Sequence, residues 1–584
     1  MNYNLNENSK KIVGKRGFGA SLRKLAIIIG TEQRKLFVAF IAIALNVGLS
    51  LLGPYLLGYT IDTHVQTKNY EGVLIFAGIL LIIYIVAYIL NYVQIRMMGG
   101  IGQRLLFRLR NDVFEKLQEL PLDFFNQNKA GDLISRINND TDKLNEFFSH
   151  SLMQFIRSLI MMSGAGIFLL SINMPLGLAT LSPTLLLLIF TISISPWIRR
   201  KNKDTLKSIG NLSAEIQEGL ANFKVIVAFN RRDYFRKQLG EATHENYKKS
   251  VRAGIANSLM SPIYTFASNI GQLIVLTLGI WVIMEERFTV GLLIRFIAYV
   301  SNFYNPLRQI ASLWASFQLT LAAWDRISHL LSLENNLPVT QCEETTDKSA
   351  LIQFENVSFA YPDGKEVLKN INFELQEGKT YAFVGPTGGG KTTTASLVSR
   401  LYDVTKGTIL LNGKDIKSFT ACERASKIGF ILQDPILFTG TVRENILYGN
   451  NECGALTDKQ LESALSDAQL FNLLNSFDKG LETQIEMGGD TISLGQKQII
   501  AFMRAILRKP ELLILDEATA NIDTVTEKQL EIILKNLPKS TTKVIIAHRL
   551  NTIQNADEIF FVNSQKIIES GSFDEALNLL MQEL

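Results

Sequence analysis

The chain has 584 residues, more than one hydrophobic core usually holds, and its mean hydropathy is positive although 20% of its residues are charged. Part of it is therefore expected to lie in lipid. Residues 351–584 hold 23 Lys and Arg against 30 Asp and Glu, a net charge of −7, so residues 1–350 carry +11. That excess fits contact with anionic lipid headgroups, whereas a nucleic-acid role would need basic clusters away from the membrane flanks.

The three cysteines, Cys342, Cys422 and Cys453, are widely spaced, so neither a disulfide framework nor a zinc site is predicted. The N-terminus is polar and lacks a short apolar core with a small-residue cleavage site, so no cleavable signal peptide is expected. A basic stretch at about 18–29 is predicted to form a helix on the inner leaflet, with an ordinary cytosolic helix as the alternative.

Six apolar stretches, each near the ~20 residues that a bilayer requires, follow in the first half of the chain. They cover about 36–58, 73–92, 152–172, 176–197, 263–284 and 290–314. Short links join them in pairs, but some sixty residues separate the second stretch from the third and the fourth from the fifth.

The two long links are rich in Lys and Arg, and the short links hold few basic residues. The positive-inside rule therefore puts the long links and both termini in the cytosol, as in a multi-pass protein of the cytoplasmic membrane. Apolar residues recur at helical spacing through much of the long links, so the spanning helices are predicted to extend well into the cytosol.

A polar, acidic segment at 331–350 marks a linker between residues 1–330, a transmembrane domain, and residues 351–584. Beyond the linker, short apolar runs alternate with helical stretches, which is typical of an α/β domain with a largely parallel sheet. The predicted fold class is a membrane α-helical domain of six transmembrane helices with long cytosolic extensions, fused to an α/β P-loop NTPase domain.

A complete phosphate-binding loop, GPTGGGKT, begins at Gly385. It follows a predicted strand at 380–384 and opens a predicted helix at 393–401, the context that the GxxxxGK[ST] motif requires. In such a loop the backbone N–H groups surround the phosphates of ATP, Lys391 reaches their oxygens, and the Thr392 hydroxyl is a ligand of Mg²⁺. The predicted nucleotide-binding residues are Gly385, Pro386, Thr387, Gly388, Gly389, Gly390, Lys391, Thr392 and Thr393. A Gly-rich turn without a nucleotide is the alternative.

Two acids close the buried strand predicted at 511–517, ELLILDE. Asp516 is predicted to hold Mg²⁺ through a water, and Glu517 to polarise the water that attacks the γ-phosphate. A chance pair of carboxylates without a metal is the alternative. Gln433, which follows another predicted strand, can supply its amide to Mg²⁺ or to the attacking water.

His548 follows an apolar strand predicted at 544–547. A histidine in such a place is often a structural hydrogen-bonding group, but ligands of parallel sheets bind at the carboxyl ends of strands. We therefore interpret His548 as a contact to the γ-phosphate. Tyr361 is predicted to stack its ring on adenine, with an ordinary core tyrosine as the alternative.

These motifs, taken in chain order, resemble the motif set of the ATP-binding cassette (ABC) proteins. The set is Tyr361, GPTGGGKTT, Gln433, ISLGQKQ at 492–498, LLILDEAT, Asn521–Ile522–Asp523 and AHR around His548. The six-span pattern, with the sequences at 120–142 and 289–310, resembles the multidrug and lipid exporters of that superfamily. The resemblance covers nearly the whole chain and implies a half-transporter that works as a dimer.

In such dimers ATP lies between the Walker motifs of one subunit and the signature of the other. The resemblance therefore implies that Ser493, Gly495, Gln496 and Asp523 take part in nucleotide binding. The signature here reads ISLGQ where the family usually has LSGGQ. Ser493 and the amide of Gly495 are still able to meet a γ-phosphate from a helix N-terminus. Leu494, however, puts a bulky side chain where the family keeps a glycine.

The expected function is ATP-driven export of amphipathic substrates, drugs or lipids, by alternating access, since ATP drives such a change by binding one state better than the other. Helical turns at about 124–132 and 215–222 are expected to dock on the cassettes. The alternative is a nucleotide-gated channel or a non-transporting regulator, which an intact Glu517 and His548 disfavour. A soluble ATPase is excluded by the spans, and importers of this superfamily generally carry the two parts on separate chains.

An asymmetry among the motifs predicts a heterodimer. The chain keeps every group that hydrolysis needs, yet its signature is irregular at Leu494, and Met487 stands nearby where the family usually has an acid. Heterodimeric exporters of the superfamily often divide their sites in this way, so the partner is expected to have a regular signature and a replaced catalytic carboxylate. A homodimer that tolerates Leu494 is the alternative.

Polar and aromatic residues inside the spans are candidates for the substrate cavity, although hydrogen bonding between helices explains such residues equally well. They are Asn46, Tyr264, Asn269, Gln272, Tyr299, Asn302 and Phe303. Arg295, close to the outer end of the last span, is expected to snorkel to the headgroups rather than to bind an anion.

Overall fold

The structure is a computed structural model. It describes residues 3, 5, 30–285, 288–334, 337–340, 350–361, 364–450, 456–486, 491–516, 524–546, 556–570 and 575. The chain forms two compact units, and each is described by itself. The helical unit comprises Asn6–Leu117 and Gly131–Ser332, and the cassette unit comprises Met1–Leu5, Gln118–Ala130 and Leu333–Leu584.

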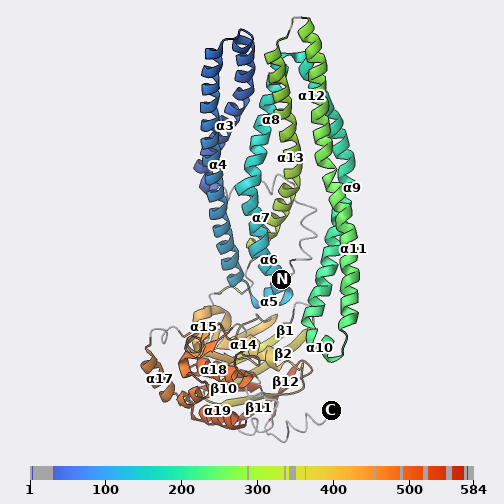
Figure 1. The fold of residues 1–584 in the computed structure, drawn as a ribbon. Coiled ribbons are helices and arrows are strands. Elements are labelled where there is room, and N and C mark those ends of the chain that lie inside the picture. The colour runs from blue at the N-terminus through green and yellow to red at the C-terminus, as the bar shows by residue number, and fades with distance from the viewer. Residues whose placement is uncertain are drawn as a thin grey trace. The chain divides into compact units, whose positions relative to one another are not determined.

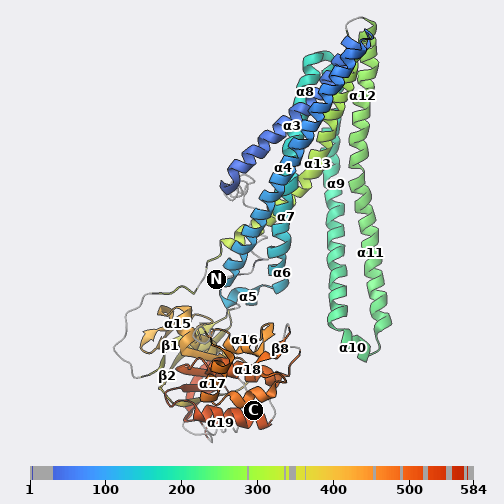
Figure 2. The ribbon, with the colours of Figure 1, turned by 60° about the vertical axis from the view of Figure 1, so that its left-hand side comes forward.

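Long helices make up the helical unit (Figure 1). They are α3 (Gln33–Thr60), α4 (Tyr70–Glu119), α8 (Leu152–Ile172), α9 (Met174–Ala221), α11 (Arg232–Ser258), α12 (Met260–Met284) and α13 (Val290–Leu331). Shorter helices α6 (Ala130–Ser135), α7 (Thr141–Glu146) and α10 (Phe223–Ala228) lie between them, and α10 joins the side-by-side helices α9 and α11 (Figures 1 and 2).

Several of these helices are much longer than a bilayer is thick. The 50 residues of α4 span about 75 Å at ~1.5 Å per residue, against a hydrocarbon core of ~30 Å. Five helical stretches of the described chain are long and apolar enough to cross a membrane: Gln33–Val65, Tyr70–Glu119, Ala130–Ile172, Met174–Ala221 and Arg232–Met284. The sixth expected span lies in α13, whose apolar sequence is interrupted by polar residues such as Arg295, Asn302 and Asn305.

Helix α13 packs against α3, α8 and α12. Its approach to α3 is close, because a Cβ on Gly291 would lie 2.1 Å from the backbone oxygen of Gly58. Phe296, Tyr299, Val300 and Tyr304 of α13 are fully or almost fully buried in the apolar core of the unit. This helix therefore organises the packing of the helical unit.

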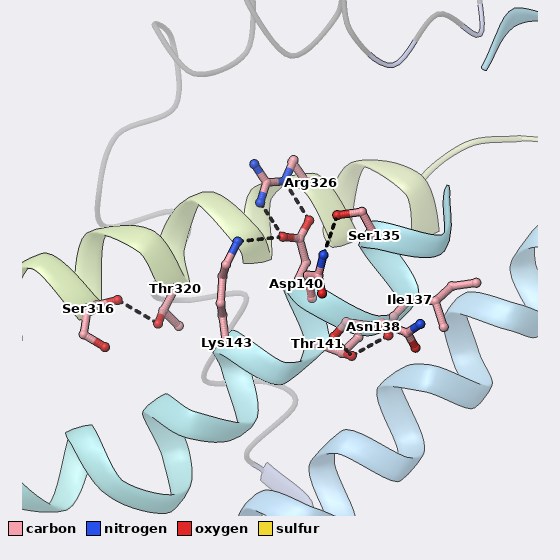
Figure 3. A network of polar contacts seen from close by, with 10 residues as sticks. Ser135, Ile137, Asn138, Asp140, Thr141, Lys143, Ser316, Thr320 and Arg326 are labelled. Atoms are coloured by element: carbon pink, nitrogen blue, oxygen red, sulfur yellow. Dashed lines mark hydrogen bonds and ion pairs between the residues drawn. The ribbon is translucent and has the colours of Figure 1, made fainter. Parts of the chain in front are cut away.

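A charged network holds the far part of α13 against the helical turns that precede α8 (Figure 3). The side chain of Asp140 is only 3% exposed and lies between Arg326 and Lys143. Arg326 donates from Nε to Asp140 at 2.7 Å, and its own backbone oxygen accepts from Arg136 at 2.9 Å. Burial lowers the pKa of the Arg136 guanidinium, with the nearby charge of Arg326 acting in the same direction.

The cassette unit contains two main sheets with strands β1 to β12. Their bounds are β1 (Ile352–Ala360), β2 (Glu366–Leu375), β3 (Thr380–Val384), β4 (Lys406–Leu411), β5 (Lys414–Asp415), β6 (Ile428–Ile431), β7 (Gly440–Thr441), β8 (Gln484–Ile485), β9 (Leu512–Asp516), β10 (Thr542–Ile546), β11 (Glu558–Asn563) and β12 (Lys566–Ser570). Strands β2-β1-β4-β5 form an antiparallel sheet, and the order β12-β11-β3-β10-β9-β6 forms a six-stranded sheet.

All neighbours in the larger sheet are parallel except β11 and β12, so the largely parallel sheet is confirmed. Helices of this unit are α5 (Leu122–Gln127), α14 (Lys391–Val398), α15 (Ala421–Lys427), α16 (Val442–Leu447), α17 (Asp458–Asp467), α18 (Leu494–Ile506) and α19 (Thr524–Asn536). The expected fold class, a helical membrane part fused to an α/β part, is confirmed.

Candidate functional site

The phosphate loop lies where the sequence predicts it, between β3 and the N-terminus of α14. Gly385 has φ +149°, and a Cβ there would lie 2.1 Å from the backbone oxygen of Val562 in β11. Only glycine tolerates both conditions. Strand β3 is central in its sheet, so the loop projects from a rigid strand, with the amide groups of the α14 N-terminus beside it.

Lys391, the first residue of α14, is 5% exposed. Its ammonium group donates to the backbone oxygens of Gly385 at 2.7 Å and Pro386 at 3.0 Å. The cation is therefore folded over its own loop, at the place where phosphate oxygens of a bound nucleotide require a positive charge.

Thr392 and Asp516 meet at the end of two elements. The Thr392 hydroxyl donates to Asp516 Oδ1 at 3.2 Å, and Asp516 is 2% exposed. Hydroxyl and carboxylate oxygens are ligands that Mg²⁺ prefers, so these two residues fit a magnesium ion.

The neighbouring strand ends converge on the same edge of the sheet. Ile546 of β10 pairs with Asp516 of β9, and Ile431 of β6 pairs with Leu515, so Gln433, two residues beyond β6, follows a neighbouring strand end and is exposed. His548 follows the end of β10 and Glu517 the end of β9. Both lie outside the described residues, as do Asp523 and Met487.

Tyr361 lies at the end of β1 and is half-buried. Its hydroxyl is 3.0 Å from the hydroxyl of Thr393 in the first turn of α14, and its ring meets the ring of Tyr402 edge-on at 5.5 Å. The aromatic ring is thus anchored next to the phosphate loop, which is where an adenine-stacking residue is needed.

The signature segment forms the start of α18. Ser493 caps this helix, because its hydroxyl accepts from the amide of Gln496 at 3.2 Å while the Gln496 side chain accepts from the amide of Ser493 at 2.8 Å. Gln496 also donates to the backbone oxygen of Ser476 at 2.6 Å. Leu494 is 37% exposed, so its bulk stands at the free end of the helix beside Gly495.

The short helix α5 of the first long link belongs to the cassette unit. Asn126 donates to the hydroxyl of Tyr402 at 2.7 Å, and Phe124 is completely buried. Burial raises the pKa of the Tyr402 phenol, against the opposing effect of the hydrogen bond from Asn126, so the hydroxyl stays protonated. The docking expected near 124–132 therefore lies within this unit, whereas the turn at 215–222 belongs to the helical unit.

Two residues at the N-terminus cover α5. Tyr3 and Leu5 are each 1% exposed, and the Tyr3 ring meets the Phe124 ring edge-on at 6.2 Å. Asn128 donates to the backbone oxygen of Tyr3 at 3.0 Å and accepts from the amide of Leu5 at 3.1 Å. No sequence motif indicated this contact, because two residues carry no periodic pattern.

Two of the candidate cavity residues have structural partners. Asn46 donates to the backbone oxygen of Ala87 at 2.6 Å, which ties α3 to α4. Tyr299 is fully buried, stacks on Phe168 at 4.9 Å and donates to the backbone oxygen of Leu51 at 2.8 Å. Both residues therefore hold helices together.

The expectation that Arg295 snorkels is wrong. Arg295 is 8% exposed, lies over the ring of Tyr55 at 4.7 Å and faces Asp62 at 3.8 Å. Asp62 also accepts from the Thr289 hydroxyl at 2.7 Å and from the amide of Gly291 at 2.8 Å. The start of α13 is thus tied to the end of α3, and an acid 233 positions away in sequence cannot be recognised as a partner from the sequence alone.

Tyr264, Asn269 and Gln272 come together in one polar cavity between α12 and α13. The same cavity contains Asn305 and Arg308, which the sequence analysis did not select. Their spacing of three and four residues from Ser301 and Tyr304, on an otherwise apolar helix, is the signal that would have found them.

Comparison with known proteins agrees with this arrangement. Residues 36–307 match the model of the ABC transporter transmembrane region, and residues 368–520 match the model named ABC transporter. An uncharacterized ABC transporter ATP-binding protein of Bacillus subtilis, YfiC, is 32% identical over 583 residues, which are 98% of this chain and 94% of that protein.

Two relatives have a named substrate or resistance. A fatty acid ABC transporter ATP-binding/permease protein of Mycobacterium tuberculosis is 34% identical over 497 residues, 85% of this chain and 78% of the relative. A multidrug resistance ABC transporter ATP-binding and permease protein of Lactococcus lactis is 30% identical over 501 residues, 85% of this chain and 84% of the relative.

Proposed function

The chain belongs to the ABC transporter family, as a multi-pass membrane protein that couples ATP hydrolysis to transport, and we propose that it exports amphipathic molecules as one half of a dimer. The proposed direction is out of the cytosol across the cytoplasmic membrane, with both termini cytosolic. Drugs and lipids are the proposed substrate classes, in keeping with the names of the multidrug and fatty acid relatives.

The observation that carries the proposal is the joining of Thr392 to Asp516 at the end of the phosphate loop, in a chain with bilayer-spanning helices. ATP and Mg²⁺, when bound there, supply a γ-phosphate whose charge is partly neutralised. Lys391 holds phosphate oxygens, Thr392 and Asp516 hold the metal, and Gln433 supplies an amide to the metal or the attacking water. Glu517 is proposed to accept a proton from that water, with His548 contacting the γ-phosphate.

A continuous series of contacts connects the loop with the first long link. Thr393 contacts Tyr361, Tyr361 contacts Tyr402, and Tyr402 accepts a hydrogen bond from Asn126 of α5. Closing the cassettes around ATP is proposed to move α5, and with it the helices that α5 joins. ATP favours that change because it binds the closed state better.

The proposed partner is a second, different half-transporter. The exposed Leu494 at the start of α18 faces whatever approaches this helix end, and its bulk opposes close contact with a phosphate in the other site. The partner is then expected to carry a regular signature, which completes the site of Glu517, and to lack the equivalent carboxylate. Ser493, Gly495, Gln496 and Asp523 are proposed as the nucleotide contacts of this chain beyond its own phosphate loop.

The export proposal is tested in inverted membrane vesicles from cells that express the full chain. A radiolabelled amphiphile is expected to accumulate inside against its gradient when ATP is supplied, and not with a non-hydrolysable analogue. Passive flux that ATP only gates would overturn export in favour of a nucleotide-gated channel. ATPase activity that no tested amphiphile changes, with no flux, would favour a non-transporting regulator.

The heterodimer is tested by purifying the chain alone and then together with proteins that copurify from its native membrane. The chain alone is expected to show little substrate-stimulated ATPase activity, and a complex with a half-transporter of regular signature is expected to restore it. A stable homodimer with two sites of equal turnover would rule the heterodimer out.

A further inference from the structure

A small polar cavity lies between α12 and α13 in the helical unit. Its volume is about 170 Å³, and its wall includes Tyr264, Asn269 and Gln272 of α12 and Ser301, Asn305 and Arg308 of α13. On each helix these residues recur three, four or five positions apart, so each helix turns one polar stripe toward the cavity. Polar stripes on helices at bilayer depth mark functional sites.

We infer that this cavity binds the anionic headgroup of the exported amphiphile, with Arg308 as the cation that pairs with a carboxylate or phosphate. The inference rests on the proposed export function and names the substrate class of that function.

The charge of the cavity carries the first step. Among the wall residues, all in the described part of the chain, Arg308 is the one with a charged side chain, and it has no ion pair or hydrogen bond there. Its planar guanidinium binds a carboxylate or phosphate through two parallel hydrogen bonds. Because the wall contains no acid, a cationic headgroup would meet repulsion, and a neutral one would leave Arg308 unmatched.

The amide groups carry the second step. Asn269 and Asn305 are exposed and make no hydrogen bond within the described residues, unlike Asn46, which bonds to a neighbouring helix. A bare amide in hydrocarbon costs free energy, so these two side chains need water or a ligand with hydrogen-bonding groups. A headgroup with several acceptor oxygens satisfies both amides and Arg308 together.

The rest of the wall is already fixed. Gln272 donates to the Ser301 hydroxyl at 3.0 Å, and Tyr304 donates to the backbone oxygen of Thr180 at 2.9 Å. Tyr264 is 3.2 Å from the hydroxyl of Thr191. These bonds hold the cavity open in one shape and leave Asn269, Asn305 and Arg308 for the ligand.

Size and depth carry the last step. The cavity is smaller than the roughly 300–1,000 Å³ of sites that enclose a drug-sized molecule, so it holds a headgroup and leaves a chain outside. Arg308 lies about 27 Å along α13 from Val290 at ~1.5 Å per residue, which is close to one full hydrocarbon thickness of ~30 Å. The charged end therefore lies near one membrane boundary while an acyl chain remains in the hydrocarbon.

The test uses three radiolabelled amphiphiles with the same hexadecyl chain and different headgroups. These are hexadecyl phosphate, hexadecylphosphocholine and hexadecyltrimethylammonium, offered to inverted vesicles that contain the full chain. ATP-driven uptake of the anionic phosphate is expected to exceed that of the other two. Arg308→Gln is expected to raise its half-saturating concentration by about 10-fold or more, since a charge-assisted bidentate contact is lost.

Two further variants make this result specific. Arg308→Lys keeps the charge and is expected to restore most of the uptake, whereas a merely structural arginine would not be rescued. Arg200→Gln removes an exposed arginine of α9 outside the cavity and is expected to leave half-saturation unchanged. ATP binding and the melting temperature of each variant report whether it folds.

The outcomes separate the two proposals. If none of the three probes accumulates with ATP, the proposed export fails. If the zwitterionic or cationic probe accumulates as well as the anion, and Arg308→Gln leaves uptake of the anion unchanged, export stands and the headgroup site is refuted. If added phosphatidylglycerol protects the cavity without being moved, and competes with the probe, the cavity is a static lipid site and the inference is overturned.

Discussion

Two regions of this molecule hold buried charges in opposite ways. In the cassette unit, Lys391 is bonded to Gly385 and Pro386, six and five positions earlier in the chain. In the helical unit, Asp140 is bonded to Arg326, 186 positions later. The first charge is placed by a local turn of the backbone, and the second only by the packing of α13 against distant turns.

This difference teaches which function each charge serves. A cation held by its own loop adds little to the tertiary fold, so its burial serves a ligand. A pair that joins remote segments is a structural contact whose removal leaves a charge buried without its partner. Mutations in the loop should therefore affect ligand binding with little loss of stability, and mutations in the network should do the reverse.

The largest effect is expected for Lys391→Ala. Without the ammonium group, the charge of the nucleotide phosphates is no longer offset, and ATP affinity at this chain's own Walker site is expected to fall by at least ~100-fold, the equivalent of about 3 kcal/mol. The melting temperature without nucleotide should stay near that of the unchanged protein. Binding is measured with a fluorescent ATP analogue on the full chain.

Lys406→Ala is the matched control, because Lys406 is exposed at the start of β4 in the same unit. It should bind ATP normally. Wild-type affinity in Lys391→Ala would remove this lysine from the site, and a large drop in its melting temperature would show that the loop cation is structural after all.

Glu517→Gln is expected to have the next largest effect, on turnover rather than on binding. The amide keeps the size of the side chain but cannot accept a proton from water, so steady-state ATP hydrolysis should fall by about 100-fold while nucleotide affinity is kept. Phosphate release and ATP binding are measured on the same preparation. Hydrolysis close to the wild-type rate would exclude Glu517 as the base.

The same difference decides what the sequence predicted. The phosphate loop, Asp516 and the capped start of the signature helix depend on contiguous residues, and a linear motif is enough to place them in the fold. The pairing of Arg295 with Asp62, and the roles of Tyr299 and Asn46, depend on which helices become neighbours. Helical periodicity identifies polar residues in a span but not the helix they face, so Arg295 was assigned to the headgroups.

Arg326→Ala is the variant that tests the network itself. Asp140 stays buried and loses its two-point partner, and the full chain should be destabilised by about 2 kcal/mol. This value is below the ~3–5 kcal/mol for a fully buried pair because the Arg326 side chain is 40% exposed and Lys143 remains. The melting temperature of the detergent-solubilised protein measures it.

Lys143→Ala is the control within the same network. Lys143 is three positions from Asp140 and reaches it at 3.3 Å, so its loss should lower the melting temperature less. Equal stability of both variants and the unchanged protein would mean that remote pairing does not stabilise this region. ATP affinity should be unaffected in either variant.

The smallest effect is expected where the two kinds of contact meet, at Tyr402→Phe. This change removes only the hydroxyl that accepts from Asn126 of α5, a bond of 2.7 Å across a long sequence separation, and leaves the ring against Tyr361 in place. One neutral hydrogen bond contributes about 1 kcal/mol, so transport should fall by about threefold. ATP hydrolysis should stay near normal because the phosphate loop is untouched, and the ratio of transport to hydrolysis, measured in vesicles, is therefore the decisive quantity. Tyr448→Phe is the control, since Tyr448 is exposed in the same unit and its ring stacks on Phe438. An unchanged ratio in Tyr402→Phe would mean that α5 follows the cassette through its buried apolar contacts, such as Phe124, and that the hydrogen bond adds nothing to coupling.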